Sequence, residues 1–171
     1  MRNVTVIKTA PGKSAEAWKQ VKPLRSVLKN WFCAWLASRS PSGLNLFFYR
    51  KMGIKVGENV QIMPDVRMEI FFPELITIGD GVVIGQDCFF ACHEFDPTSF
   101  KYGPITIGKN ALIGARSFIL PGVSIGDNAL VSAQTVIYKD VPVNVLAFGS
   151  PLQFKELEVN PLTKKQPKSK K

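Results

Sequence analysis

Aliphatic side chains recur at every sixth position along most of the chain, and this period constrains the fold more than any other feature. The series has two interruptions and comprises Val56, Ile62, Met68, Ile78, Ile84, Phe90, Ile107, Ile113, Ile119, Ile125, Val131 and Ile137. A helix would space its apolar residues three and four apart, and a half-buried strand would alternate them. A period of six is instead typical of a coiled parallel sheet, in which each block supplies a short strand and a turn.

Each block of six also has a consistent internal pattern. Glycine often follows the aliphatic residue, as at Gly79 and Gly126, and a small or β-branched residue stands four positions after it, as at Val82 and Ala111. We expect the glycine to permit unusual backbone angles at the turn, and the aliphatic side chains to stack from coil to coil. With three blocks in each coil, the sequence predicts an all-β solenoid, a parallel β-helix of about four coils.

Several segments carry a family resemblance. Ile-Gly-Asp-Gly-Val-Val at 78–83 and Ile-Gly-Asp-Asn-Ala-Leu at 125–130 resemble the hexapeptide repeats of left-handed β-helix acyltransferases. The ordered segments 103–108, 120–123 and 139–142 are similar to the maltose, galactoside and polysaccharide O-acetyltransferase branch. The resemblance covers about residues 45–155 and implies a left-handed coil. It also implies direct transfer from acetyl-CoA to a saccharide hydroxyl within a ternary complex.

His93 is the single histidine of the chain, and it stands where the second interruption of the repeat begins. Taken alone, it is better explained as a surface-loop residue than as a catalytic one. The family resemblance implies a catalytic histidine at this point, within a His-x-x-Asp-Pro run that His93, Asp96 and Pro97 match. We therefore predict that His93 is the general base and that Asp96 contacts the substrate. Cys92 is not expected to be a nucleophile, because adjacent side chains of an extended segment point apart.

The resemblance further implies a groove for coenzyme A between two subunits, near the later coils. The residues that match the family's contacts are Gly114, Ala115, Ser132, Ala133, Tyr138 and Lys139. Small side chains would let the pantetheine arm approach the backbone, and Lys139 would meet a phosphate as a point charge. The first four are equally explained as turn residues, and both interpretations can hold. One histidine, with no finger-like cysteine spacing, predicts no metal site.

Charge is distributed unevenly along the chain. Residues 1–55 carry a net charge of +10, residues 56–154 carry −5 and residues 155–171 carry +4, which together give +9. Basic ends around an acidic body, without interleaved stacking aromatics, argue against nucleic acid as a partner. No apolar run of about 18 residues is present to span a bilayer, and no signal peptide is recognisable. Three cysteines are too few for a disulfide scaffold, so a cytoplasmic location is expected.

The basic N-terminal part contains an amphipathic pattern that starts at Leu24. Its apolar residues have helical spacing and are Leu24, Val27, Leu28, Trp31, Phe32, Trp35 and Leu36. One interpretation is that this helix caps an open end of the coil, in which case both tryptophans should be buried. The other is contact with an anionic membrane, assisted by Lys19, Lys22, Arg25 and Lys29. The two roles need not exclude each other.

These observations predict three parts. They are an N-terminal basic helical segment at 1–50, a β-helix domain at 51–155 with a loop insertion at about 93–106, and a basic disordered tail at 156–171. The predicted function is acetyl-CoA-dependent O-acetylation of a small-molecule or lipid-linked saccharide by a homotrimer. The predicted location is the cytoplasm, with peripheral contact at the inner face of the membrane. The alternative is a non-catalytic, membrane-associated or scaffolding β-helix module.

Overall fold

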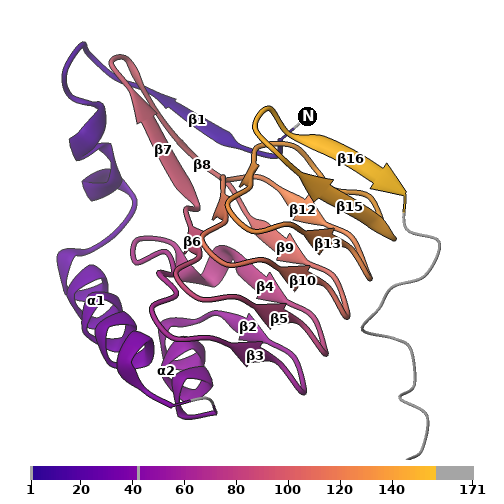
Figure 1. Ribbon diagram of the computed structural model, residues 1–171. Coiled ribbons are helices and arrows are strands. Elements are labelled where there is room, and N and C mark those ends of the chain that lie inside the picture. Colours follow the sequence, from indigo (N-terminus) through magenta and orange to yellow (C-terminus); the bar gives the residue numbers. More distant parts are fainter. Residues whose placement is uncertain (1, 42, 157–171) are drawn as a thin grey trace, which may run out of the picture.

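The main body is a stack of short parallel strands in a computed structural model that describes residues 2–41 and 43–156 (Figure 1). Strands equivalent in the repeat pair with one another in three sheets. The first sheet contains β2 (Lys55–Val56), β4 (Ile76–Ile78), β9 (Ile105–Ile107) and β12 (Ser124–Ile125). The second contains β3 (Gln61–Ile62), β5 (Val83–Ile84), β10 (Leu112–Ile113), β13 (Leu130–Val131) and β15 (Val145–Phe148). The third contains β6 (Phe89–Phe90), β11 (Phe118–Ile119) and β14 (Val136–Ile137).

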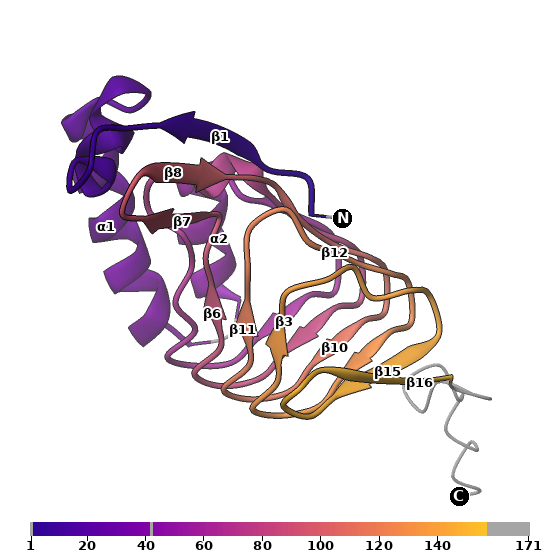
Figure 2. The same cartoon turned by 90° about the horizontal axis from the view of Figure 1, so that it is seen from above.

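The register of these sheets follows the period of six. Ile78 pairs with Ile107, and Ile84 pairs with Ile113, so each aliphatic residue lies over its equivalent in the next coil. Seen along the stack, the sheets form the sides of a triangular coil (Figure 2). Their inward side chains are almost completely buried, and so is Cys88, which stands four positions after Ile84. The predicted solenoid of parallel strands is confirmed.

The repeat glycines have a different role from the one we expected. Gly126 does not have a positive φ, and a Cβ built on it would lie 2.5 Å from the backbone nitrogen of Val143 in the next coil. The unusual backbone angles occur two residues later, for example at Asn128 with φ of 57°. Close approach between coils therefore requires the glycine, whereas asparagine or aspartate mostly occupies the left-handed position, which these residues tolerate.

Both interruptions of the repeat leave the coil at the same corner. Arg67 bridges Phe89 in parallel register, so Met68 lies over Phe90 and the chain departs after each of them. The first excursion holds a short 3-10 helix, η2 (Pro73–Leu75). The second is a hairpin of β7 (His93–Asp96) and β8 (Ser99–Tyr102), to which β1 (Thr5–Lys8) adds as a third strand. Segments distant in sequence therefore meet at this corner.

The N-terminal helices pack on the first coil. A 3-10 helix, η1 (Ser14–Gln20), leads to α1 (Leu24–Arg39) and α2 (Leu44–Met52). In α2, the buried Asn45 side chain donates to the carbonyl of Ile62, 2.8 Å away, and Tyr49 Oη donates to the carbonyl of Val66. Because β3 is the edge strand of its sheet, α2 covers the open end of the solenoid.

α1 has its large apolar side chains on the outside. It buries Val27, Asn30 and Ala37, whereas Trp31 is 57% exposed and Trp35 is 45% exposed. The buried tryptophans required by a purely capping helix are therefore not observed. The part of the chain that the structure describes contains no helix long and apolar enough to cross a membrane.

At the other end of the stack, β16 (Gln153–Glu156) pairs antiparallel with β15. Apart from Glu156, the tail predicted at 156–171 lies outside the described residues.

Candidate active site

His93 and Glu69 form the central pair of the candidate site. Glu69 directly follows Met68, and His93 follows Phe90 by three residues, so the two excursions from the shared corner bring them together. His93 Nδ1 lies 2.6 Å from Glu69 Oε2. The same carboxylate accepts the backbone N–H groups of Cys92 at 2.8 Å and Phe71 at 2.7 Å. Glu69 thus acts as an acceptor throughout, so Nδ1 donates and Nε2 is left as the acceptor nitrogen of the ring.

Burial makes this arrangement rigid. The Glu69 side chain is 1% exposed, whereas that of His93 is 23% exposed. A buried carboxylate is stable only when hydrogen bonds compensate for its lost solvation, and three donors do so here. Phe71 meets the imidazole edge-on with ring centroids 4.9 Å apart, and Phe100 covers it at 5.8 Å. Glu69, Phe71 and Phe100 together therefore hold the imidazole ring in one orientation.

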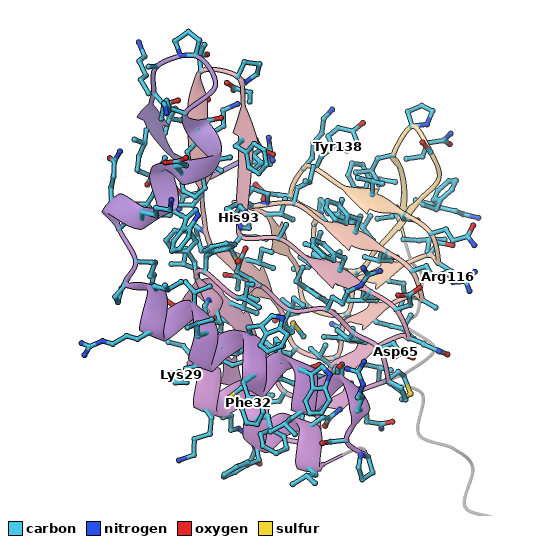
Figure 3. The ribbon with its side chains drawn as sticks, turned by 90° about the vertical axis from the view of Figure 1, so that its left-hand side faces the viewer. Lys29, Phe32, Asp65, His93, Arg116 and Tyr138 are labelled. Carbon is cyan, nitrogen blue, oxygen red and sulfur yellow. The ribbon has the colours of Figure 1, made fainter. Side chains whose placement is uncertain are left out.

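A cavity of about 630 Å³ lies beside the pair, and we call it the His93 cavity. Its walls come from α1, from the first excursion and from the third sheet (Figure 3). The lining is largely apolar and aromatic, and includes Trp31, Trp35, Met68, Ile70, Phe71 and Phe89 beside His93 and Glu69. Concave apolar sites with a few convergent polar groups are typical of small-molecule binding.

Cys92 has no access to this chemistry. It is 0% exposed, and burial, reinforced by the negative charge of Glu69, raises the pKa of its thiol far above the ordinary value. A thiol held protonated is a weak nucleophile. These facts agree with the expectation that Cys92 is not the nucleophile.

Asp96 lies farther along the hairpin and is occupied there. It accepts a hydrogen bond from Ser99 Oγ at 2.6 Å and one from the backbone N–H of Thr98 at 2.9 Å. These bonds hold the pKa of its carboxyl far below the ordinary value. Lys101 pairs with it at 3.3 Å. Asp96 is absent from the described lining of the His93 cavity, so its predicted substrate contact stays a prediction.

The residues predicted to hold coenzyme A occupy two corners, one at each end of the third sheet. Gly114, Ala115, Ser132 and Ala133 stack at the corner that leads into β11 and β14, and a Cβ on Gly114 would lie 2.4 Å from the Ala133 nitrogen. Tyr138 and Lys139 follow β14 and lie at the His93 corner, two coils on. The structure therefore separates the predicted set into two groups.

A second cavity of about 440 Å³ occupies the first of these corners, and we call it the corner cavity. Ala115, Ala133 and the exposed Arg116 line it. It shares Asp65 and Asp87 with the His93 cavity, so the two hollows adjoin on one side of the molecule. Figure 3 shows His93, Arg116 and Tyr138 from that side.

Sequence reasoning missed Glu69 and the cavity-lining role of the tryptophans. Glu69 had one available signal, since it is an acid that directly follows a core position of the repeat, where the series breaks. Trp31 and Trp35 were recognised only as parts of an amphipathic helix. Within residues 2–41 and 43–156, no group of three His, Cys, Asp or Glu side chains could hold a metal ion.

The coiled parallel sheets with a period of six define a protein of the hexapeptide-repeat class. Residues 104–139 match the family model "Hexapeptide repeat of succinyl-transferase". The Bacillus subtilis (strain 168) protein "Putative acetyltransferase YvoF" is 36% identical over 136 residues, 78% of this chain and 79% of that protein. Galactoside O-acetyltransferase of Escherichia coli (strain K12) is 34% identical over 113 residues, 62% of this chain and 55% of that protein.

Solved structures share the fold. The hexapeptide-repeat acetyltransferase VCA0836 of Vibrio cholerae, complexed with acetyl-coenzyme A, has a TM-score of 0.67 at 22% identity and covers 80% of this chain and 89% of its own. A maltose O-acetyltransferase from Clostridium difficile 630 has a TM-score of 0.63 at 20% identity, and the match covers 80% of this chain and 88% of that chain. The chain belongs to the hexapeptide-repeat acetyltransferase family.

Proposed function

We propose that the protein is an acetyl-CoA-dependent O-acetyltransferase that acts on a saccharide-type hydroxyl, with His93 as general base. The observation that carries this proposal is the buried Glu69 carboxylate bonded to His93 Nδ1 at the edge of an apolar cavity. A carboxylate in this position holds the imidazole in the tautomer whose Nε2 accepts a proton. The similarity to galactoside O-acetyltransferase supports a saccharide acceptor.

The reaction needs one proton to move and no acyl-enzyme. As the acceptor oxygen bonds to the thioester carbonyl carbon, His93 Nε2 takes its proton. The carbon–sulfur bond then breaks, and the proton passes to the departing sulfur, which restores the neutral imidazole. Glu69 stabilises the transient imidazolium and fixes its orientation, as the carboxylate does in other histidine pairs. The developing oxyanion needs a hydrogen-bond donor, and the proposal assigns this role to a backbone N–H of the neighbouring loop or coil.

The donor and the acceptor reach His93 from different directions in this proposal. Acetyl-CoA lies in the corner cavity beside Ala115 and Ala133 and extends across the third sheet toward Tyr138 and Lys139. Arg116 supplements the predicted set, because it is an exposed cation in that cavity and suits a phosphate. The acceptor then occupies the His93 cavity, with Asp96 as a more distant contact on the hairpin.

The proposal includes a homotrimer of left-handed solenoids, each of about four coils. The outer face of the third sheet supports such an assembly, since Phe89 and Phe118 stack there at 4.8 Å and Val136 is 41% exposed. A neighbouring subunit would cover this apolar strip and complete the coenzyme A groove. The proposed location is cytoplasmic, peripheral at the inner face of the membrane. Light scattering at micromolar concentration tests the trimer, and a stable, active monomer would contradict it.

The decisive experiment measures thiol release from acetyl-CoA in the presence of a panel of sugars and amines. We expect release that depends on a hydroxyl acceptor, with mass spectrometry locating an ester on the product. His93→Ala serves as the control for release that does not involve the site. Release with amines alone, or release unchanged in the variant, would reject the proposed reaction.

A further inference from the structure

Helices α1 and α2 carry large apolar side chains that are exposed and are not buried in the core of the fold. We define the apolar helix face as Leu24, Leu28, Trp31, Phe32 and Trp35 of α1 together with Leu44 and Phe47 of α2. Each of these side chains is between 45% and 61% exposed. The α1 members recur at helical spacing along one side, next to the stripe of Val27, Asn30 and Ala37 that packs inward. Large apolar side chains grouped in this way mark an interaction surface.

Cationic side chains accompany this face. Arg25 and Lys29 are exposed on α1, Arg39 is its last residue, and Lys51 lies in the last turn of α2. Arg39 stands 5.1 Å from the Trp35 ring centroid, and Lys51 stands 5.5 Å from that of Phe47. Lys29 Nζ donates to the Lys51 carbonyl at 3.3 Å, which joins the two helices.

Among the described residues, Arg25, Lys29, Arg39 and Lys51 form no ion pair, whereas Lys22 is held by Glu74 and Lys19 by Glu16. The charge available to an outside partner is therefore concentrated beside the apolar helix face. Exposed tryptophan next to unpaired Lys and Arg is the pattern of a helix that lies in a membrane interface.

We propose that the apolar helix face docks on an anionic lipid membrane and that the enzyme takes its acceptor from that membrane. The charge favours lipid over a second copy in two-fold contact, since such contact would place these cations against each other. α1 and α2 are fixed to the solenoid by buried hydrogen bonds from Asn30, Asn45 and Tyr49, so the surface is preformed. This proposal rests on the proposed acetyl transfer only for the choice of acceptor.

The His93 cavity opens beside this surface. Trp31 and Trp35 belong both to the apolar helix face and to the cavity wall, and Ile70, Phe71 and Phe89 continue the apolar lining toward His93. Figure 3 shows Phe32 and Lys29 on α1, on the same side as His93. An acceptor with a hydroxyl-bearing head and an aliphatic chain fits this geometry, with the head at His93 and the chain along the tryptophans. A lipid-linked saccharide is such a compound.

Vesicle binding tests the docking surface without reference to activity. The full chain is sedimented with vesicles of equal parts phosphatidylglycerol and phosphatidylcholine, and with phosphatidylcholine alone. We expect binding to the anionic vesicles, weakened by salt, with a blue shift of tryptophan fluorescence. Replacing Lys29 and Lys51 by Gln should weaken binding about fivefold for each removed cation.

Two matched double variants distinguish vesicle binding through this face from nonspecific adsorption of exposed apolar groups. Leu28→Ser with Phe32→Ser should reduce vesicle affinity more than tenfold and leave thiol release with a water-soluble sugar unchanged, since neither residue lines the His93 cavity. Val143→Ser with Phe154→Ser, which removes exposed apolar groups near the other end of the stack, should change neither. Circular dichroism verifies that each double variant keeps the fold intact. No binding by the folded wild type at low salt would overturn the proposal. Dissociation of an oligomer by the Leu28 and Phe32 changes, without vesicle binding, would assign the face to a second copy.

Methyl and octyl glycosides of one sugar test the acceptor class below the micelle concentration. We expect the octyl compound to have a KM about tenfold lower, because burial of even two methylenes supplies that difference. Trp31→Ser should remove most of this difference. Equal KM values would overturn the amphipathic acceptor, whereas absence of transfer to both would count against the proposed acetyl transfer and leave the vesicle result standing.

Discussion

The regular coils and the corner where the repeat is interrupted differ in what their side chains do. In the regular coils, equivalent positions carry equivalent residues, and Ile84 and Ile113 are each completely buried in register. At the interrupted corner, Glu69 and His93 are neither equivalent nor periodic, and they share a 2.6 Å hydrogen bond. The regular part thus supplies a rigid frame, and the departures from it supply the polar chemistry.

Two interruptions at one corner can do more than a single one. A single excursion would place one polar group at the surface. Two excursions from adjacent coils at the same corner bring a carboxylate and an imidazole together, because coils repeat at the strand spacing of about 4.8 Å. The glycines and buried aliphatics of the frame fix that spacing. The corner and the regular coils can be tested by separate substitutions.

Removal of the imidazole should have the largest effect. We expect His93→Ala to lower turnover about a hundredfold or more, because His93 is the only imidazole among the residues that line the His93 cavity. Steady-state thiol release measures the loss. Coenzyme A binding by calorimetry should stay unchanged, and the protein should stay folded, since the His93 side chain lies at the cavity and outside the solenoid core. The thermal midpoint should fall somewhat, because buried Glu69 loses one of its three donors. Wild-type turnover in this variant would remove His93 from the base role.

A substitution in the regular coils should lower the stability of the fold more than it lowers the rate of the reaction. Gly126→Ala forces a Cβ to within 2.5 Å of the Val143 nitrogen and 2.8 Å of the Pro142 carbonyl carbon, both backbone atoms of the next coil. We expect a loss of about 1–3 kcal/mol in the free energy of unfolding, as for other overpacked positions. Denaturant unfolding measures it, and Thr106→Ala on the exposed side of β9 is the control. If Gly126→Ala is as stable as that control, close coil contact is not the reason for the glycine.

Neutralising the carboxylate should reduce turnover less than removing the base. Glu69→Gln preserves the shape of the side chain but loses the charge that orients His93 and stabilises its protonated form. We expect kcat to fall about tenfold, with KM for both substrates unchanged, because Glu69 is buried behind the imidazole. A rise in KM at constant kcat would show that Glu69 shapes the cavity and does not act through His93.

The same contrast explains what the sequence could predict. The period of six gives the three sheets and their core because every coil repeats the same contacts, so local pattern and long-range packing agree. Glu69 could not be paired with His93, since that requires knowing that Met68 and Phe90 lie at one corner. The outward orientation of Trp31 could not be predicted from the sequence either. Helical spacing shows an apolar side but not that Val27, Asn30 and Ala37 would face the solenoid instead.

The role of the repeat glycines was wrong for a related reason. Sequence shows that Gly126 recurs, but only the distance to Val143 shows that space, and not φ, selects it. Asn128 takes the positive φ that we had assigned to glycine. Periodicity therefore predicts which positions are special, whereas the neighbouring coil decides why.

The smallest expected effect concerns a cation at the interrupted corner. Lys139 is exposed after β14 and stands 5.5 Å from the Tyr138 ring centroid, where it would meet a phosphate of acetyl-CoA. A single exposed charge acts through solvent, so we expect Lys139→Gln to raise KM for acetyl-CoA about threefold with kcat unchanged. Lys109→Gln is the matched control in the regular coils, because Lys109 pairs with Asp80 at 3.1 Å, and this partner raises its pKa. The Lys139 effect should shrink in high salt, whereas the control should show no change in KM at any salt concentration. Equal KM values for Lys139→Gln and Lys109→Gln would place the phosphates elsewhere, with Arg116 in the corner cavity as the next residue to replace.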